Sequence, residues 1–147
     1  MKKIKVLIAD DEKEVLEVMS KKIRLEGYEV ITAGDGLAAW NLIVSESPDV
    51  ILLDLTMPGM DGFSVLKKLR ETPPSQKWQP VIIVSGLNEL EDMQKGFSLE
   101  ADHYLTKPCH INDILKAIQL MIGLIPQRKS KLEIESPLTN PQSANET

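Results

Sequence analysis

The sequence predicts a single α/β domain built on one doubly wound, five-stranded parallel sheet with five helices. Short apolar runs alternate with amphipathic stretches of helical period, and the runs lack the in–out alternation of a strand that has one face in water. The chain has 147 residues, of which 42% are apolar, so a sizeable core can form. A parallel sheet covered by helices on both faces fits these three observations.

Five short apolar runs are the expected strands. The first follows a basic N-terminus, and the fifth is the weakest of the set. The expected strands cover residues 3–9, 28–32, 50–53, 81–84 and 102–105. Five strands are enough to complete a small α/β domain.

Five amphipathic segments follow the strands in turn and predict helices. They cover residues 12–26, 37–45, 63–70, 89–99 and 111–124. The last is the clearest, because its isoleucine and leucine side chains recur at three- and four-residue steps and form one apolar stripe. Gly27 is a stop signal for the first helix, and Pro73-Pro74 breaks the chain after the third.

The character of the sequence changes after Pro126. Residues 127–147 contain two further prolines and scattered Ser, Thr, Asn and Gln without a sustained period. We therefore expect a domain over residues 1–126 and a flexible C-terminal tail over residues 127–147. No output domain is expected after Pro126, unless the chain is a fragment of a longer protein.

Charge and cysteine content argue against several classes of partner. Seventeen Lys and Arg against 22 Asp and Glu give a net charge of −5, so nucleic acid is not expected as a direct partner. The single cysteine, Cys109, excludes an intrachain disulfide and a Cys-based zinc site, and it indicates the cytoplasm. No apolar run approaches the roughly 18 residues of a membrane span, so no membrane partner is expected.

Acidic side chains follow two of the expected strands. Asp10 and Asp11 follow the first strand and Asp54 follows the third, at the sheet edge where ligands bind in open parallel sheets. If these strands are neighbours, each carboxylate pair about 4 Å apart costs about 4 kcal/mol at an effective dielectric near 20. Such repulsion requires a cation, and an all-oxygen ligand set suits Mg²⁺, or Mn²⁺, rather than zinc.

The remaining strand ends supply groups that bind phosphate. Ser85 follows the fourth strand and offers a hydroxyl donor, while Lys107 follows the fifth and adds a positive charge. A metal, an ammonium and a hydroxyl together match the oxygens of a phosphoryl group. Asp54 stands alone at its strand end and is the expected nucleophile, whereas the Asp10–Asp11 pair is better placed to hold the metal.

Four segments at these strand ends form a specific set. They read VLIADD at residues 6–11, LDLTMPGMDG at 53–62, IVSG at 83–86 and ADHYLTKP at 101–108. In this order, over residues 4–125, they resemble the receiver domain of two-component response regulators, especially the stand-alone chemotaxis type. The resemblance implies a flavodoxin-like fold with strand order 2-1-3-4-5 and a phosphorylation-dependent signalling switch.

The resemblance also implies a chemical role for each acidic residue. Asp54 is the implied phosphorylation site, which accepts a phosphoryl group from a sensor histidine kinase or a phosphotransfer protein and later loses it by self-dephosphorylation. The implied Mg²⁺ ligands are Asp10, Asp11, Asp54 and the backbone carbonyl of Thr56. Lys107 resembles the phosphate-pairing lysine of the family, on a Lys-Pro bond that is usually cis. We therefore expect a signalling module rather than a turnover enzyme.

Ser85 and Tyr104 match the switch pair of the family. The resemblance implies that the Ser85 hydroxyl moves to the phosphoryl group and that the Tyr104 ring turns inward behind it. The surface formed by the fourth helix, the fifth strand and the fifth helix then changes for a downstream protein partner. A ligand shifts such an equilibrium only when it binds the two states with different affinities.

Three features depart from the family pattern. Cys109 replaces the Phe that is common after Lys-Pro, Glu100 stands where a Gly often ends the fourth helix, and the loop over residues 71–80 is long. None of the three alters the set of charges at the strand ends. They put in doubt the detail of the partner surface rather than phosphorylation.

Simpler structural roles remain open for the same residues. A short oxygen side chain followed three residues later by Glu caps a helix, which applies to Asp11 and Glu14. The simple roles at the strand ends are a solvated acid for Asp54, a strand-end cap for Ser85, a half-buried ring for Tyr104 and a plain turn at Lys107-Pro108.

A glycine motif after the second expected strand imitates a dinucleotide-binding site. Residues 34–39 read GDGLAA and satisfy the pattern G-x-G-x-x-A. However, Asp35 would face the pyrophosphate with like charge, and the motif does not follow the first strand. A nucleotide site would also leave Asp10, Asp11 and Lys107 without a role, so we do not predict one.

Two rival functions share parts of this residue set. A Mg²⁺-dependent phosphohydrolase would also use Asp54 as its nucleophile, but enzymes of the haloacid-dehalogenase type need a second Asp two positions on, where this chain has Thr56. A pseudo-receiver that binds partners without phosphorylation would not need the complete set of acids, hydroxyl and lysine.

Overall fold

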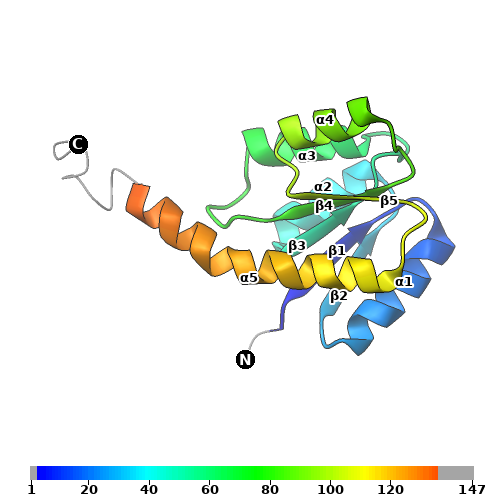
Figure 1. Ribbon diagram of the computed structural model, residues 1–147, viewed down its shortest axis with the longest axis horizontal. Coiled ribbons are helices and arrows are strands. Elements are labelled where there is room, and N and C mark those ends of the chain that lie inside the picture. The colour runs from blue at the N-terminus through cyan, green and yellow to red at the C-terminus, as the bar shows by residue number, and fades with distance from the viewer. Residues whose placement is uncertain (1–2, 136–147) are drawn as a thin grey trace.

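A five-stranded parallel sheet forms the centre of the molecule (Figure 1). The structure is a computed structural model that describes residues 3–135. The strands are β1 (Lys5–Ala9), β2 (Glu29–Ala33), β3 (Val50–Leu53), β4 (Val81–Ser85) and β5 (His103–Thr106). Their order in the sheet is β2-β1-β3-β4-β5, and every pair is parallel. Both the predicted fold class and the predicted strand order are confirmed.

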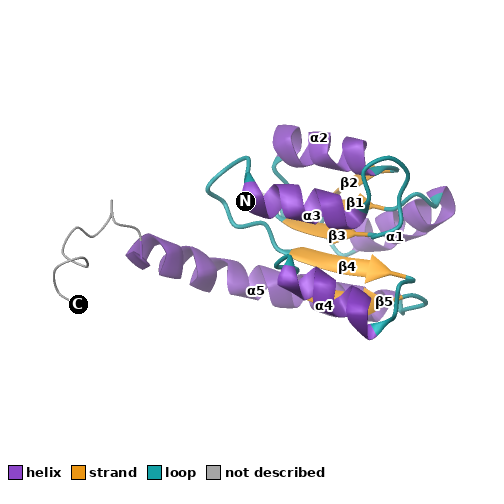
Figure 2. Ribbon diagram, turned by 90° about the horizontal axis from the view of Figure 1, so that it is seen from above, coloured by secondary structure: helices purple, strands orange, loops and turns teal. Residues whose placement is uncertain are grey.

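Five helices cover the two faces of the sheet (Figure 2). They are α1 (Lys13–Leu25), α2 (Gly36–Glu46), α3 (Gly62–Glu71), α4 (Leu90–Ser98) and α5 (Ile111–Glu135). Helices α2 and α3 bury Ile43 and Leu66 against one face of the sheet. Helices α1 and α5 bury Ile23 and Ile118 against the other. The fold is therefore a three-layer sandwich with the sheet in the middle.

Successive residues of each central strand enter different cores. On β1, Leu7 packs into the core beneath α2 and α3, while Val6 and Ile8 pack into the core beneath α1 and α5. Side chains of a strand alternate between its faces, and here both faces are dry. This explains why the strands read as uniform apolar runs rather than as alternating patterns.

Helix α5 is longer than the sequence pattern predicts. The pattern places its end at residue 124, but the helix continues through Pro126 to Glu135 and passes the edge of the sheet in Figure 1. Proline in a helix interior costs about 3 kcal/mol and usually ends a helix, yet the Gln, Arg, Lys and Leu residues that follow have good helix propensity. The rest of the expected tail, residues 136–147, lies outside the described residues, and the domain boundary at 126 stays a prediction.

The turn between α4 and β5 has an unusual backbone. Glu100 adopts φ +70°, in the left-handed region, at the position where the family often has glycine. Its backbone carbonyl accepts a hydrogen bond of 3.1 Å from the Arg70 side chain. Tertiary contacts therefore hold a conformation that glutamate does not favour.

None of the helices within residues 3–135 combines the length and apolar character needed to cross a membrane.

Candidate functional site

Three aspartates meet at the carboxyl end of the sheet. Strands β1 and β3 are neighbours, with Ala9 opposite Leu53, so the residues that follow them lie side by side. One carboxylate oxygen each from Asp10, Asp11 and Asp54 all lie within 4.8 Å of one another. Asp10 and Asp54 are only 2% and 5% exposed, whereas Asp11 is exposed. The predicted convergence of the three acids is therefore observed.

The two buried aspartates are oriented by backbone donors. The Thr56 N–H donates to Oδ1 of Asp54 over 3.1 Å, and the Glu12 N–H donates to Oδ1 of Asp10 over 2.9 Å. In each carboxylate, the other oxygen, Oδ2, contacts the ammonium of Lys107. Each buried acid thus has one oxygen held by the main chain and one shared with the lysine.

Lys107 is the cation that faces the buried carboxylates. Its Nζ lies 2.6 Å from Oδ2 of Asp10, 3.2 Å from Oδ2 of Asp54 and 3.8 Å from Oε1 of Glu12. Burial lowers the pKa of Lys107, but the hydrogen bonds and charges of Asp10 and Asp54 together outweigh burial, so the pKa lies above its ordinary value. The side chain therefore stays charged at neutral pH. The Lys107-Pro108 bond is cis, as the resemblance implies.

The three carboxylates fit a hard divalent cation. They provide oxygen ligands only, which Mg²⁺ prefers, and Mg²⁺ keeps several waters when it binds through a few carboxylates. One Lys107 ammonium cannot balance three nearby acids, so the cluster carries excess negative charge even with the lysine in place. Thr56, a predicted ligand through its carbonyl, is exposed and bonds to Asp54 through its N–H.

Ser85 and Tyr104 are connected through one residue, Leu87. The Leu87 N–H donates to Oγ of Ser85 over 3.3 Å, and the Leu87 carbonyl accepts from the Tyr104 hydroxyl over 2.6 Å. Ser85 is fully buried at the end of β4, while Tyr104 is half-buried. Burial is the main reason why the pKa of Tyr104 is raised, with smaller effects from Asp92 and Asp54. The simpler roles of Ser85 as a strand-end cap and Tyr104 as a half-buried ring thus both have structural support.

The helix-cap role considered for Asp11 is not what the structure contains. Helix α1 begins at Lys13 after Glu12, and no side chain caps its first turn. The nearby Asp10 carboxylate accepts from the N–H of Glu12, the residue before the helix. Sequence reasoning missed Leu87 and Glu12. Leu87 contributes only backbone groups, and these leave no signal in the sequence. Glu12 follows Asp11 directly, so its position in the sequence could have indicated that it lies at the site.

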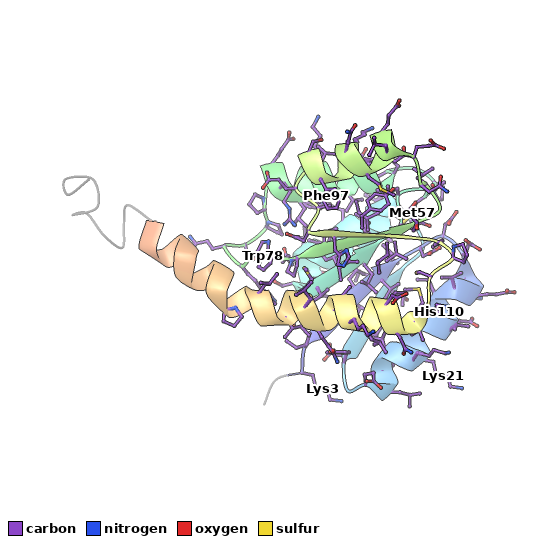
Figure 3. All side chains as sticks on the ribbon, viewed as in Figure 1. Lys3, Lys21, Met57, Trp78, Phe97 and His110 are labelled. Carbon is purple, nitrogen blue, oxygen red and sulfur yellow. The ribbon has the colours of Figure 1, made fainter. Side chains whose placement is uncertain are left out.

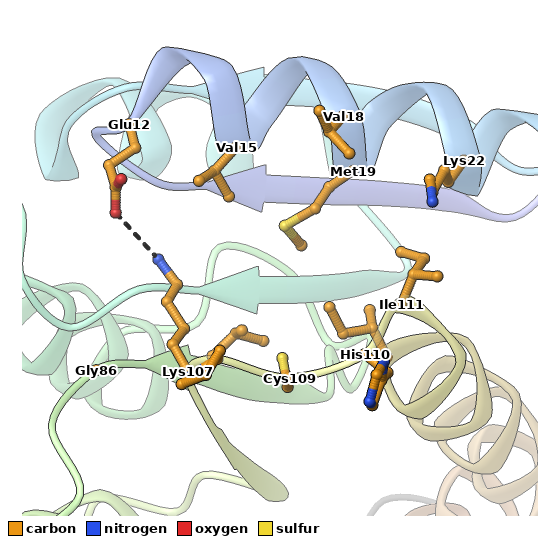
Figure 4. A pocket seen from close by; sticks show the side chains of 13 residues that line it. Glu12, Val15, Val18, Met19, Lys22, Gly86, Lys107, Cys109, His110 and Ile111 are labelled. Atoms are coloured by element: carbon orange, nitrogen blue, oxygen red, sulfur yellow. Dashed lines mark ion pairs between the residues drawn. The ribbon is translucent and has the colours of Figure 1, made fainter.

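A groove of about 710 Å³ runs beside the site between α1 and the start of α5 (Figure 4). Its lining is mainly apolar and includes Val15, Met19, Ile111 and Ile114. The Glu12–Lys107 ion pair lies at one end, and Cys109 lies within the groove (Figure 4). Burial raises the pKa of the half-buried Cys109 thiol, as does the charge of Asp113, while Lys107 lowers it. The thiol is therefore mostly protonated at neutral pH.

Comparisons with known proteins agree with this geometry. The family model for the response regulator receiver domain matches residues 6–119. The DNA-binding dual master transcriptional regulator RpaA of Synechocystis sp. is 34% identical over 140 residues, which cover 92% of this chain and 58% of that protein. The probable transcriptional regulator ycf27 of Guillardia theta is 35% identical, over 93% of this chain and 51% of that protein. The chain thus spans about half the length of these curated relatives.

Solved structures show the same fold. A response regulator receiver domain protein (CheY-like) from Methanospirillum hungatei is 27% identical with a TM-score of 0.80, and the match covers 86% of this chain and 99% of that chain. The chemotaxis protein CheY4 of Vibrio cholerae is 32% identical with a TM-score of 0.75, over 82% of this chain and 99% of that chain.

The relatives contradict one expectation from the sequence. The net charge of −5 argued against nucleic acid as a direct partner, but RpaA is named as DNA-binding and ycf27 as a probable transcriptional regulator. The prediction was wrong because net charge describes only the residues counted. In proteins of this kind, a segment beyond the matched part can contact DNA whatever the charge of the matched part.

Proposed function

The chain belongs to the response regulator receiver domain family of two-component systems, and from this we propose that Asp54 is the residue that accepts the phosphoryl group. The observation that carries the proposal is the contact set of this carboxylate. Asp54 is almost fully buried, has one oxygen on the Thr56 N–H and the other on Lys107, and lies beside Asp10 and Asp11. A buried carboxylate held in this orientation can attack phosphorus once a cation bound by the three acids offsets their repulsion.

The proposed step transfers phosphorus from nitrogen to oxygen. An Asp54 oxygen attacks the phosphorus of a phosphohistidine in a sensor kinase or phosphotransfer protein, the P–N bond breaks, and the imidazole nitrogen leaves with the electron pair and takes up a proton. Magnesium, when bound by Asp10, Asp11 and Asp54, supplies positive charge to the phosphoryl oxygens. Water later attacks the acyl phosphate, which regenerates Asp54 and releases phosphate.

Lys107 and Ser85 are the proposed partners of the phosphoryl group. The Lys107 ammonium already contacts Asp54, so a phosphoryl group on that carboxylate arrives beside it. Oγ of Ser85 accepts a bond from Leu87, and within residues 3–135 no group accepts the Ser85 hydroxyl proton. That proton is available to a phosphoryl oxygen. Lys107 and Ser85 can therefore both bind the phosphoryl group on Asp54, and no further charged residue is needed.

The proposed switch passes through Leu87 to Tyr104. A Ser85 hydroxyl that turns toward the phosphoryl group weakens its bond with the Leu87 N–H, and the Leu87 carbonyl is the acceptor of the Tyr104 hydroxyl. Tyr104 in turn packs near the Phe97 ring of α4, with 6.3 Å between ring centroids. Phe97 and Leu90 are large apolar side chains exposed on α4, which suits a surface for a downstream partner.

We propose control of transcription as the output of the longer regulator to which this chain corresponds. The support comes from RpaA and ycf27, whose names describe transcriptional regulators and of which this chain matches about half. The proposed compartment is the cytoplasm, as the single cysteine suggests. A DNA-binding segment encoded directly after codon 147 would support this output.

A stand-alone regulator of the chemotaxis type is the second candidate. The observation that favours it is the match to CheY4, which covers 99% of that chain. In this case the signal passes by protein contact at the α4 surface. A stop codon after codon 147 in the gene would favour this candidate over the transcriptional one.

Phosphate labelling of the purified chain tests the proposed site. With ³²P-acetyl phosphate and Mg²⁺, we expect label on the wild type, none on Asp54→Asn, and wild-type labelling of the control Asp113→Asn, an exposed acid on α5. Chelation of Mg²⁺ with EDTA should abolish labelling. Label that persists in Asp54→Asn would place the phosphoryl group elsewhere and refute the proposal.

A turnover assay separates the switch from a phosphohydrolase. We expect at most slow release of phosphate from the chain's own acyl phosphate and no multiple turnovers of a phosphomonoester such as p-nitrophenyl phosphate. Thr56 offers no carboxyl group two positions after Asp54 to act as acid and base. Rapid multiple turnovers would favour the enzyme.

A further inference from the structure

The glycine motif after β2 lies close to the loop that follows Asp54. The motif begins at Gly34, and its second glycine, Gly36, is the buried first residue of helix α2. A Cβ atom built at Gly36 would overlap the backbone carbonyl oxygen of Met60, whereas a Cβ at Gly34 meets nothing within 4 Å. Of the two glycines, only Gly36 is therefore required for close packing. The group packed against it is a backbone carbonyl of the protein rather than a nucleotide.

The loop that approaches Gly36 connects β3 to α3 and spans residues 54–61. It begins with Asp54, and its Thr56 N–H donates to Oδ1 of Asp54. At its far end, Gly62 is packed so closely that a Cβ would overlap the Asp54 carbonyl oxygen. The loop is thus held between two helix starts, α3 at Gly62 and α2 at Gly36.

A side chain at Gly36 would displace the loop rather than the helix. Helix α2 is fixed by Ala39 and Ile43, both with no exposed surface, and by the Asp35 side chain, which accepts from the Ala38 N–H. Leu55 and Met57 anchor the first half of the loop in the core, but the stretch that leads to Met60 is exposed and includes Gly59 with φ +72°. Packed cores resist movement more than exposed loops do. The strain would therefore move Met60 and, along the same loop, the Thr56 amide that is bonded to Asp54.

We propose that Gly36 is a positioning residue for the reaction at Asp54. Because Gly36 has no side chain, the Met60 carbonyl can pack directly against the start of α2. This contact fixes the position of the loop over residues 54–61. The Thr56 amide of that loop orients the Asp54 carboxylate. The inference rests on the proposed function of Asp54. It also explains why a nucleotide-like glycine motif occurs in a chain that the motif's usual ligand does not fit.

Metal affinity and labelling rate of matched glycine variants test the proposal. We expect Gly36→Ala to weaken Mg²⁺ binding, measured by calorimetry, and to slow labelling by acetyl phosphate at saturating Mg²⁺, each by about tenfold. Gly34→Ala, two residues away with open space around it, should change either quantity by less than about twofold. A Gly36→Ala variant that loses only thermal stability, with Mg²⁺ affinity and labelling rate unchanged, would overturn the positioning role.

A measurement on the wild type keeps the test valid if Gly36→Ala does not fold. Phosphorylation of Asp54 should shift the backbone amide resonances of Gly36 and Met60 in ¹H–¹⁵N spectra, because the loop transmits the change to this contact. The amide of Gly27, in the turn between α1 and β2 at the opposite end of the sheet, should not move. Unshifted Gly36 and Met60 resonances in a chain that carries label would refute the inference alone, whereas a wild type without label would refute the proposed function.

Discussion

At the amino end of the sheet Asp49 and Asp102 each have a cation of their own, whereas at the carboxyl end three carboxylates share one ammonium. Figure 3 allows the two ends to be located, with Trp78 at the amino end and Met57 and His110 toward the carboxyl end. Both ends hold acids that are largely removed from water. They differ in whether the charges cancel.

Two acids at the amino end, Asp102 and Asp49, are each paired with a cation and with a backbone donor. Oδ2 of Asp102 accepts from Arg70 and from the Val81 N–H, both over 2.8 Å. Oδ1 of Asp49 lies 2.7 Å from the Lys77 ammonium, and its Oδ2 accepts from the Lys5 N–H over 2.8 Å. Such pairs fix loops and strand ends, and they leave no net charge for a ligand.

The carboxyl end is left with excess negative charge. Lys107 contacts Asp10 and Asp54, and Asp11 adds a third acid within 4.8 Å. The comparison teaches that burial of acids alone does not mark a functional site in this fold. The marker is an uncompensated set of like charges, because only such a set gains from a cation or from a group that changes its charge.

The same substitution at the two ends should have opposite effects on stability. Asp102→Asn breaks an ion pair whose side chains are only 13% and 22% exposed, and we expect it to lower the free energy of unfolding by about 2 kcal/mol. Urea denaturation in EDTA measures the change. An effect within about 0.5 kcal/mol would show that the amino end is no better compensated than the site.

Magnesium should stabilise the chain through the carboxyl end alone. At a Mg²⁺ concentration ten times its Kd, the free energy of unfolding should rise by about 1.4 kcal/mol. Asp11→Ala, which removes one of the three acids, should lose most of this gain at the same Mg²⁺ concentration, while Asp102→Asn should keep it. A metal titration that Asp11→Ala leaves unaltered would remove Asp11 from the ligand set.

Removal of one acid from the site should stabilise the metal-free chain. We expect Asp54→Asn to raise the free energy of unfolding by about 1 kcal/mol in EDTA at low salt, because it relieves repulsion from Asp10 and Asp11 while Lys107 keeps its shorter contact with Asp10. Added salt should reduce the gain. A loss of stability in Asp54→Asn would mean that the site is balanced like the amino end.

The strain at the amino end is in the backbone rather than in the charges. Glu100→Gly should stabilise the chain by about 0.5 kcal/mol, because glycine adopts φ +70° without a steric cost. Thermal denaturation at neutral pH measures the shift. Glu100→Ala keeps the strained φ without the acidic side chain and serves as the control, so equal gains in both variants would argue for charge instead.

The contribution of Lys107 to stability should fall only at high pH. Its pKa in the folded chain lies above the ordinary value of 10.5, so the stabilisation is complete below that value and is lost as the pH rises through the folded pKa. The difference in unfolding free energy between the wild type and Lys107→Met should stay constant from pH 7 to about 10 and then shrink. A decline between pH 7 and 9 would contradict the raised pKa.

Most of the fold was predictable because the strands are buried on both faces. The run at residues 50–53 has only apolar side chains, and the structure places β3 on the same residues. The predicted end of helix α5 was wrong because Pro126 destabilises the helix only locally, whereas the residues after it favour a helix. Sequence patterns locate an interruption but do not reveal whether the helix resumes.

The charged part of the site was predictable because strand ends fix side chains in space. Asp10 and Asp54 follow paired strands, so their proximity follows from the strand order alone. The contacts of Leu87 and Gly36 were not predictable, since they involve backbone atoms brought together by tertiary packing. Patterns of residue type do not indicate which backbone group the Ser85 or Tyr104 side chain will reach.

Helix α5 is a single long helix that begins close to the acidic site and ends far from it. The helix starts just after Lys107-Pro108, packs Ile114 and Ile118 against the sheet, and continues past the sheet edge to Glu135. At 1.5 Å per residue its 25 residues span about 37 Å. A tilt of about 5° at the first turn would displace the far end by about 3 Å. A tilt of α5 would therefore move Glu135 much farther than the residues beside the acids.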